Sequence, residues 1–354
     1  MSHTRHTAVP EPTTEDTALW TSRARVLERG ERVMPAMGAT SHAAGDRIKW
    51  KVLYIGGCGR SGSTLLDRML GQVPGVCSLG ELGQLWRALL LNQECGCGQP
   101  IQDCPFWWAV GQRAFGGWEN VDVAGVGRLA HGVVRQRCVS LMLAPGLWPP
   151  YRARLERYEH LMREVYRGVH EVSGAALIVN STKHYTNALL LERVPDLDFH
   201  VLHLMRDPRG VAYSWSKTVE KPEAVHRGRY MNRYTASRSA RRWLGYNTCF
   251  ELLARRGTPV TRVRYEDVVQ SPRTELERIL RRVGAVDLEE RLAFIDGHDV
   301  VLGPNHTVAG NPMRFRVGRI PLTVDNAWKA RLPIRDQHVV AFVTRPLRRR
   351  YGYA

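Results

Sequence analysis

The chain has 354 residues, of which 44% are hydrophobic and 24% charged, as in an ordinary globular protein. This size excludes a small disulfide-stapled scaffold, and the composition excludes wholesale disorder or a fibrous repeat. Lysine and arginine number 51 against 34 acidic residues, a formal net charge of +17 at pH 7. Such a charge fits an anion-binding cleft, because arginine offers phosphate or sulfate a planar set of donors, and it fits equally a solvated basic surface.

The sequence shows no sign of membrane insertion or export. No apolar run reaches the roughly 18 residues that a membrane-spanning helix needs. The first residues lack the basic and apolar segments of a secretory signal peptide. Seven cysteines, an odd number in a long chain, favour reduced thiols over a disulfide framework. We therefore expect a soluble, cytoplasmic protein without integral membrane association.

Residues 1–46 are rich in Thr, Pro, Glu, Arg and Gly and show no sustained periodicity. This composition predicts a disordered leader, followed by one folded domain over residues 47–354. Within the domain, four short apolar runs predict buried strands, and a helical spacing follows each of them. The expected strands are 51–55, 176–179, 199–205 and 260–265, and the expected helices are 64–70, 185–192, 208–216 and 272–282.

The repeated order of strand and helix predicts an α/β fold, with a parallel sheet flanked by helices. Between about residues 82 and 175 the strand patterns disappear, and tryptophan, arginine and helical spacing dominate. We interpret this region as a helical insertion that shapes an acceptor pocket.

The sharpest motif is a glycine loop at residues 57–64, which read GCGRSGST between the first strand and its helix. Main-chain N–H groups at such a helix start bind phosphate, aided by the helix dipole. The loop differs from a Walker A loop, G-x-x-x-x-G-K-[ST], because Ser63 replaces the lysine that bridges the outer phosphates of a nucleoside triphosphate. A kinase is therefore disfavoured, whereas Arg60, Ser63 and Thr64 suit a single sulfated phosphate.

Residues 60–66, followed by Gly80 and Glu81, resemble the 5′-phosphosulfate loop of sulfotransferases that use 3′-phosphoadenosine 5′-phosphosulfate (PAPS). The likeness is closer to tyrosylprotein sulfotransferases and bacterial relatives than to the cytosolic phenol and steroid enzymes. It implies a P-loop-like fold and transfer of a sulfuryl group from PAPS to a hydroxyl. In that case the 5′ side of the nucleotide is bound by Gly59, Arg60, Ser61, Gly62, Ser63 and Thr64.

A second anion site is predicted where the strand at 199–205 ends. Arg206 follows this strand, and Ser214 lies eight residues later, the spacing at which the resemblance implies contacts to the nucleotide 3′-phosphate. Tyr265 ends the last predicted strand, and it either lies near the adenine, as the resemblance implies, or simply packs. Near the C-terminus, Arg314 and Arg316 flank Phe315 in the segment that resembles the loop closing over the nucleotide, so both arginines are predicted to face a phosphate.

Sulfuryl transfer needs a base for the acceptor hydroxyl and cations near the leaving oxygen. The resemblance implies that Glu81 is the base, and that Lys183 and Arg60 stabilise the developing charge. His184 is the rival base, because it precedes Arg206 by the separation found for the catalytic histidine of cytosolic sulfotransferases. Glu81 also has a structural interpretation, as a capping or ion-pairing carboxylate at the start of the next helix. This scheme requires no metal.

Cys95, Cys97 and Cys104 have a spacing that weakly suggests zinc. No fourth ligand is evident, although Cys77 or a histidine would complete a site if the fold brought it near. We favour ordinary buried or loop thiols and predict no metal ligand.

Two other functions compete with sulfotransfer. One is a P-loop kinase with a degenerate Walker A loop, and the other is a basic nucleic-acid-binding protein. Because the chain shows no nucleic-acid-binding module and no long basic stripe, we expect no nucleic-acid partner. The acceptor is open among small molecules, sugars and lipids, and the oligomeric state is unknown.

Overall fold

The computed structural model describes residues 49–220, 230, 232–285 and 291–353. Its centre is a five-stranded sheet in the order β2-β3-β1-β4-β5, with every neighbouring pair parallel. The strands are β1 (Trp50–Gly56), β2 (Val76–Ser78), β3 (Leu177–Lys183), β4 (Leu197–Met205) and β5 (Val260–Arg264). The predicted α/β fold with a parallel sheet is thus confirmed, whereas the predicted leader lies outside the described residues.

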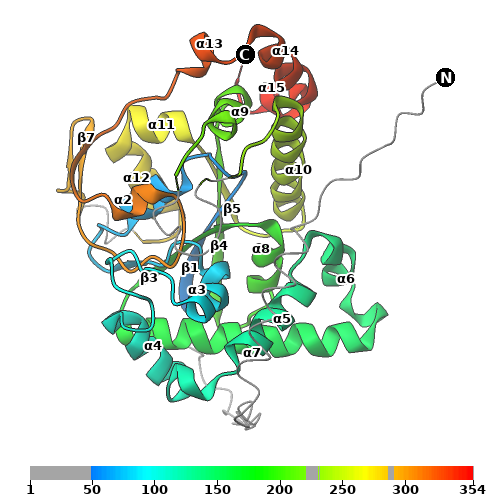
Figure 1. The fold of residues 1–354 in the computed structure, drawn as a ribbon, viewed down its shortest axis with the longest axis vertical. Coiled ribbons are helices and arrows are strands. Elements are labelled where there is room, and N and C mark those ends of the chain that lie inside the picture. Colours follow the sequence, from blue (N-terminus) through cyan, green and yellow to red (C-terminus); the bar gives the residue numbers. More distant parts are fainter. Residues whose placement is uncertain (1–48, 221–229, 231, 286–290, 354) are drawn as a thin grey trace.

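Helices follow the strands as the sequence predicts (Figure 1). They are α2 (Ser63–Leu70), α8 (Tyr185–Leu191), α9 (Pro208–Ser216), α11 (Tyr265–Gln270) and α12 (Pro272–Arg282). Proline occupies the first turn of α9 and α12, where a missing N–H costs nothing. Tyr265 corrects one predicted boundary, because it begins α11 instead of ending β5.

Over residues 82–173, all of which are described, the regular structure is helical. A loop over residues 92–104 joins α3 (Leu85–Leu91) to α4 (Pro105–Phe115). Short 3-10 turns separate α4 from α5 (Val123–Val133), α5 from α6 (Val139–Leu143) and α6 from α7 (Pro149–Ser173). Helices α4 and α5 both pack against the long α7 on one side of the molecule (Figure 1). α7 ends at Gly174, whose φ of 58° gives the left-handed turn that closes many helices.

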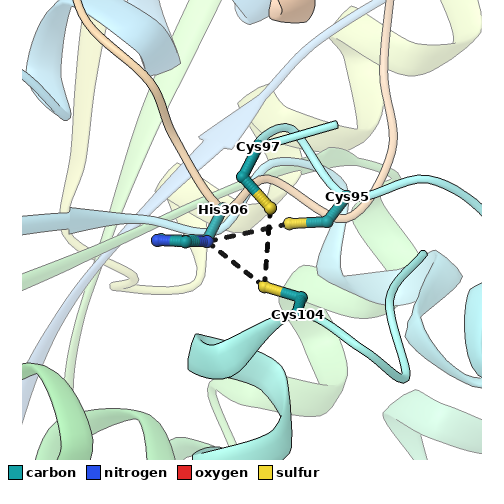
Figure 2. A group of neighbouring side chains, drawn as sticks. All are labelled: Cys95, Cys97, Cys104 and His306. Carbon is teal, nitrogen blue, oxygen red and sulfur yellow. Dashed lines mark hydrogen bonds between the residues drawn. The ribbon is translucent and has the colours of Figure 1, made fainter. Parts of the chain in front are cut away.

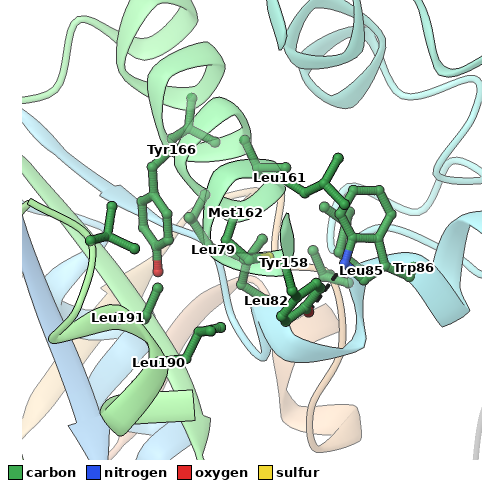
Figure 3. Close-up of a cluster of buried hydrophobic side chains, with 14 of the residues drawn as sticks. Leu79, Leu82, Leu85, Trp86, Tyr158, Leu161, Met162, Tyr166, Leu190 and Leu191 are labelled. Carbon is green, nitrogen blue, oxygen red and sulfur yellow. Dashed lines mark hydrogen bonds between the residues drawn. The ribbon is translucent and has the colours of Figure 1, made fainter. Parts of the chain in front are cut away.

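The sheet is buried on both faces, because alternate side chains of β1 enter different cores. Val52 and Tyr54 join the core under the helical region, while Leu53 and Ile55 join the core under α2 and α12. Figure 3 shows the first core, where side chains of α7 meet those that follow β2. Two buried tyrosine hydroxyls of α7 have hydrogen-bond partners there. The Tyr158 hydroxyl accepts from Trp86 Nε1 (3.2 Å), and the Tyr166 hydroxyl accepts from Asn180 Nδ2 (2.8 Å).

Several elements had not been predicted. A small antiparallel sheet contains β6 (Ile295–Asp296), β7 (Asp299–Leu302) and β8 (Gly318–Pro321). Further helices in the described ranges are α10 (Ala236–Arg255), α13 (Trp328–Arg331), α14 (Ile334–Val343) and α15 (Arg345–Arg350). Within the described ranges, no helix combines the length and the apolar character needed to cross a lipid bilayer.

Phe250 joins α10 to the sheet. Its ring is fully buried, packs beside His203 of β4 (ring centroids 5.2 Å apart) and covers Gly56, where a side chain would overlap the ring. We expect Phe250→Ala to lower the free energy of unfolding by about 3–5 kcal/mol, since a large cavity remains. Urea denaturation followed by circular dichroism measures this change. The control is Phe342→Ala, at a 77% exposed position, where a similar loss would contradict our assignment of the core.

Asp67 is a buried carboxyl on α2 that accepts a hydrogen bond from Ser78 Oγ (2.5 Å). Burial raises its pKa to about 7, despite this hydrogen bond. Because the folded-state pKa lies above the unfolded value of 3.8, ionised Asp67 destabilises the fold above pH 7, and this cost disappears as the pH falls toward 4.

We therefore expect wild type to gain about 1–2 kcal/mol of stability relative to Asp67→Asn between pH 8 and pH 5.5. Denaturation of both proteins at the two pH values gives this difference, with the exposed Asp103→Asn as the matched control. A difference that stays constant, or that falls at low pH, would show that Asp67 does not titrate in this range.

Candidate functional site

The glycine loop turns from β1 into α2 through two positions that admit no side chain. Gly57 has a φ of 138°, and a Cβ there would overlap the carbonyl oxygen of Leu204 in β4. Gly62 has a φ of 89°, and a Cβ there would overlap the ring of Tyr265. The loop therefore runs close to β4 and α11, as only glycine permits.

The amino end of α2 is open to an anion. Gly62 is its N-cap residue, and within the part of the chain that the structure describes no side chain caps the first turn. Uncapped N–H groups and the positive end of the helix dipole attract negative charge. Ser61 and Ser63 are buried at this turn, and the Ser61 hydroxyl has no hydrogen-bond partner among the described residues. The geometry thus offers unsatisfied donors where the sequence predicts a phosphate.

Arg60 lies inside the loop in the left-handed conformation, with a φ of 70°. Its guanidinium lies over the indole of Trp215, 5.0 Å from the ring centroid. Burial lowers the pKa of Arg60, while the charge of Glu81 raises it. Trp215 also contacts Gly59, so α9 supports the loop from one side.

Glu81 and Lys183 form an ion pair beside the loop. Lys183 ends β3 next to the end of β1, with a φ of 72°, and its carbonyl oxygen accepts from Gly57 N (3.4 Å). The two side chains are 15% (Lys183) and 21% (Glu81) exposed, so both are partly sheltered and partly accessible. The strand ends therefore bring a carboxylate and an ammonium group to the glycine loop.

His184 follows Lys183 but is held differently. Burial lowers the pKa of His184 to about 4, so the imidazole is neutral at neutral pH. Its Nδ1 is hydrogen bonded to the Tyr246 hydroxyl (3.0 Å), and its carbonyl oxygen accepts from the Tyr54 hydroxyl (2.7 Å). These contacts describe a packed histidine at the start of α8.

Arg206 connects the second predicted anion site to the first. It is 7% exposed, and its Nη1 donates to the Arg60 carbonyl oxygen (3.1 Å). Its Nη2 donates to Asp325 Oδ2 (3.2 Å), which also accepts from Lys217 Nζ (3.2 Å). The guanidinium lies 4.5 Å from the centroid of the Tyr265 ring. Tyr265 therefore packs between Arg206 and Gly62.

The other two predicted contacts to the 3′ side lie on different elements. Ser214 is on the second turn of α9, partly exposed and eight residues after Arg206. Arg316 follows the 3-10 turn Pro312–Phe315 and is exposed. Just before this turn, Asn311 N donates to Thr64 Oγ1 (3.4 Å), and Gly310 lies near Thr64 and Glu81. The segment predicted to close over a nucleotide therefore lies against the glycine loop.

Arg314 does not lie as predicted. Its side chain is completely buried, and its guanidinium donates to the carbonyl oxygens of Thr307 (2.8 Å), Val308 (3.3 Å) and Glu94 (2.8 Å). Because these donors point at the main chain, we withdraw Arg314 from the predicted phosphate contacts. Its position fixes the loop instead of binding an anion.

Three neighbours of the site were missed by sequence reasoning: Trp215, Lys217 and Asp325. Asp325 lies 119 residues from Arg206, so no local spacing indicates the pair. Trp215 lies in the last turn of α9, and Lys217 follows the helix. The spacing of Arg206 and Ser214 did not indicate that either residue would lie near the site. Together the cations around the loop suit a dianionic ligand, and Glu81 places a carboxylate beside the loop, a group able to accept a proton.

A family model described as "Sulfotransferase domain" matches residues 52–296, which is more than half of the sequence. No curated protein sequence matches.

Three solved structures show weak similarity. The sulfotransferase domain of the Synechococcus PCC 7002 olefin synthase is 19% identical, with a TM-score of 0.44 over 87% of this chain and 98% of that chain. The sulfotransferase domain from the curacin biosynthetic pathway is 17% identical, with a TM-score of 0.42 over 84% and 98%. Sulfotransferase STF9 from Mycobacterium avium is 12% identical, with a TM-score of 0.40 over 69% and 67%. On the extent of the family match, the chain belongs to the sulfotransferase domain family.

Proposed function

We propose that the protein transfers a sulfuryl group from PAPS to a hydroxyl of a small-molecule, sugar or lipid acceptor. The observation that carries the proposal is the uncapped start of α2, which lies between the Glu81–Lys183 pair and Arg206. Sulfotransferase family membership supports the reaction type. The Ser63 position, which lacks the Walker lysine, supports a donor without a triphosphate.

In this proposal, the 5′-phosphosulfate is held by the loop from Gly59 to Thr64, through main-chain N–H groups, the Ser61 and Ser63 hydroxyls and the Arg60 guanidinium. The 3′-phosphate is held by Arg206 and Ser214, with Arg316 reaching from the closing segment. Arg206 now pairs with Asp325, so a phosphate at this position competes with that carboxylate. The Tyr265 ring packs against the Arg206 guanidinium and lies between it and Gly62.

Glu81 is the proposed base. The acceptor oxygen attacks sulfur while its proton passes to the Glu81 carboxylate, and the bond between sulfur and the phosphate oxygen breaks. Lys183 and Arg60 stabilise the negative charge that develops on the transferring group and the leaving oxygen. His184 is a weaker candidate, because its pKa of about 4 and its hydrogen bond to Tyr246 suit a structural role.

The helical layer over residues 82–173 is the proposed wall of the acceptor pocket, inserted between β2 and β3 of the catalytic domain. We also propose a cytoplasmic location, supported by seven free cysteines among the described residues. The scheme needs no metal in the chemical step.

The first test compares adenosine 3′,5′-bisphosphate with AMP, ADP and ATP·Mg²⁺ as ligands that raise the melting temperature. We expect the bisphosphate to stabilise the protein selectively, because it alone occupies both anion sites.

The Arg206→Ala variant tests the 3′ site. We expect its affinity for the bisphosphate, measured calorimetrically, to fall roughly 10- to 100-fold, because a charged hydrogen bond is lost. Binding of AMP, which lacks the 3′-phosphate, changes less than about threefold.

The matched control is Arg319→Ala, since Arg319 is an exposed arginine of β8 that pairs with Asp296 and Asp299. It removes one positive charge and is expected to leave bisphosphate binding intact. Stabilisation by ATP·Mg²⁺ alone would favour the kinase, and salt-sensitive binding to any duplex would favour the nucleic-acid-binding function.

The second test separates the two candidate bases. We expect Glu81→Gln to lower turnover by about 10²- to 10⁴-fold, since it removes the proton acceptor, while bisphosphate binding persists. Turnover is followed as transfer of labelled sulfate from PAPS to a panel of phenols, sugars and alcohols. His184→Asn is the comparison variant. If Glu81→Gln retains turnover and His184→Asn loses it, the assignment of the base is wrong.

A further inference from the structure

Three cysteines and one histidine converge at the edge of the helical layer (Figure 2). Cys95, Cys97 and Cys104 lie in the segment before α4, and His306 lies after β7. The three sulfur atoms and one ring nitrogen all lie within 4.8 Å of one another. The sequence motif had lacked a fourth ligand, and the fold supplies it from about 200 residues away.

Three of the six separations among these atoms are close to those of a tetrahedral zinc site. With zinc–sulfur bonds of about 2.3 Å and zinc–nitrogen bonds of about 2.0 Å, tetrahedral angles separate two sulfurs by roughly 3.8 Å and a sulfur from a nitrogen by roughly 3.6 Å. The Sγ atoms of Cys97 and Cys104 are 3.7 Å apart. Nδ1 of His306 lies 3.3 Å from Cys104 Sγ and 3.9 Å from Cys95 Sγ. A disulfide requires a sulfur–sulfur distance of about 2.0 Å, which no pair in the cluster matches.

The loop that carries the cysteines is shaped by two glycines, which bring it against the histidine segment. Gly98 follows Cys97 with a φ of 86°, which turns the chain back toward the cluster. A Cβ at Gly96 would overlap the side chain of Asn305, so the loop approaches the histidine segment as closely as glycine allows.

The histidine is also oriented. Its ring stacks on Phe106, with centroids 5.1 Å apart and an interplanar angle of 15°. Trp107 Nε1 donates to its carbonyl oxygen (2.8 Å). Nδ1 thus points at the sulfurs without depending on a metal for its position.

We propose that Cys95, Cys97, Cys104 and His306 bind one structural zinc ion. Four protein ligands close the tetrahedron, and three thiolates with one imidazole form a donor set typical of structural zinc. This replaces the prediction that the chain has no metal ligand. The zinc takes no part in the proposed sulfuryl transfer. The zinc site can therefore be tested whether or not the proposed function is correct.

The ion would tie the helical layer to the segment that covers the glycine loop. From His306 the chain runs through Val308, whose N–H donates to the Leu79 carbonyl oxygen (3.0 Å), and Ala309, whose carbonyl oxygen accepts from Glu81 N (3.4 Å). Gly310 then lies against Thr64. Zinc would therefore fix His306, which lies three residues before Ala309 and four before Gly310, where this segment contacts the site.

The test is the metal content of the full chain, produced with zinc in the medium, purified under mild reducing conditions and carrying no histidine tag. We expect about one zinc per chain by plasma mass spectrometry. Cys97→Ser and His306→Ala are expected to lower the content to well under half, whereas Cys249→Ser, at a partly buried cysteine of α10, keeps it. A strong chelator is expected to lower the melting temperature and expose three further thiols to a thiol reagent.

A second measurement avoids variants that fail to fold. Cobalt(II) in place of zinc is expected to give the visible bands of a tetrahedral thiolate site in the wild-type protein. Reduced protein that binds neither zinc nor cobalt, iron in place of zinc, or a Cys97–Cys104 disulfide found by mass mapping would each overturn the proposal. None of these outcomes depends on sulfotransferase activity.

Discussion

The site depends on how closely the glycine loop before α2 approaches its neighbours, which are the main chain of β4 and an aromatic ring. Gly57 lies against the carbonyl oxygen of Leu204, and Gly62 lies against the ring of Tyr265, so neither position admits a side chain. This approach leaves the first turn of α2 uncapped. Because no side chain of the described residues caps those N–H groups, their partial positive charge is available to a ligand.

The parallel sheet brings the rest of the machinery to the same place. With β1 between β3 and β4, the ends of these strands lie side by side and present Lys183, Gly57 and Arg206 at one edge. Residues about 150 apart in the sequence thus become neighbours, as the Arg206 contact to the Arg60 carbonyl oxygen shows. Ligands bind at this edge in open α/β sheets because the strand order reverses there.

Much of this arrangement could be predicted from local sequence. Apolar runs gave the four main strands, and the glycine loop marked where the first strand turns into a helix. Long-range partners could not be predicted: Asp325 pairs with Arg206, and His306 joins three cysteines, without any local spacing that indicates either contact. Arg314 and Arg316 look equivalent in the sequence, yet one is buried among carbonyl oxygens and the other is exposed. The two arginines differ in burial, and their alternating positions around Phe315 do not determine which of them is buried.

Buried arginines make the covering segment part of the scaffold. Arg68 of α2 donates to the carbonyl oxygens of Gly303 (2.7 Å) and Arg314 (2.7 Å), and Arg314 itself donates to Thr307 and Val308. A buried guanidinium left without these acceptors would be costly, so the carbonyl oxygens must stay in place while the protein is folded. The backbone of residues 303–314 is therefore positioned without a ligand, and adjustment to the proposed nucleotide falls to exposed side chains such as Arg316. A preorganised cover of this kind lowers the ordering cost of binding and holds Glu81 beside the glycine loop.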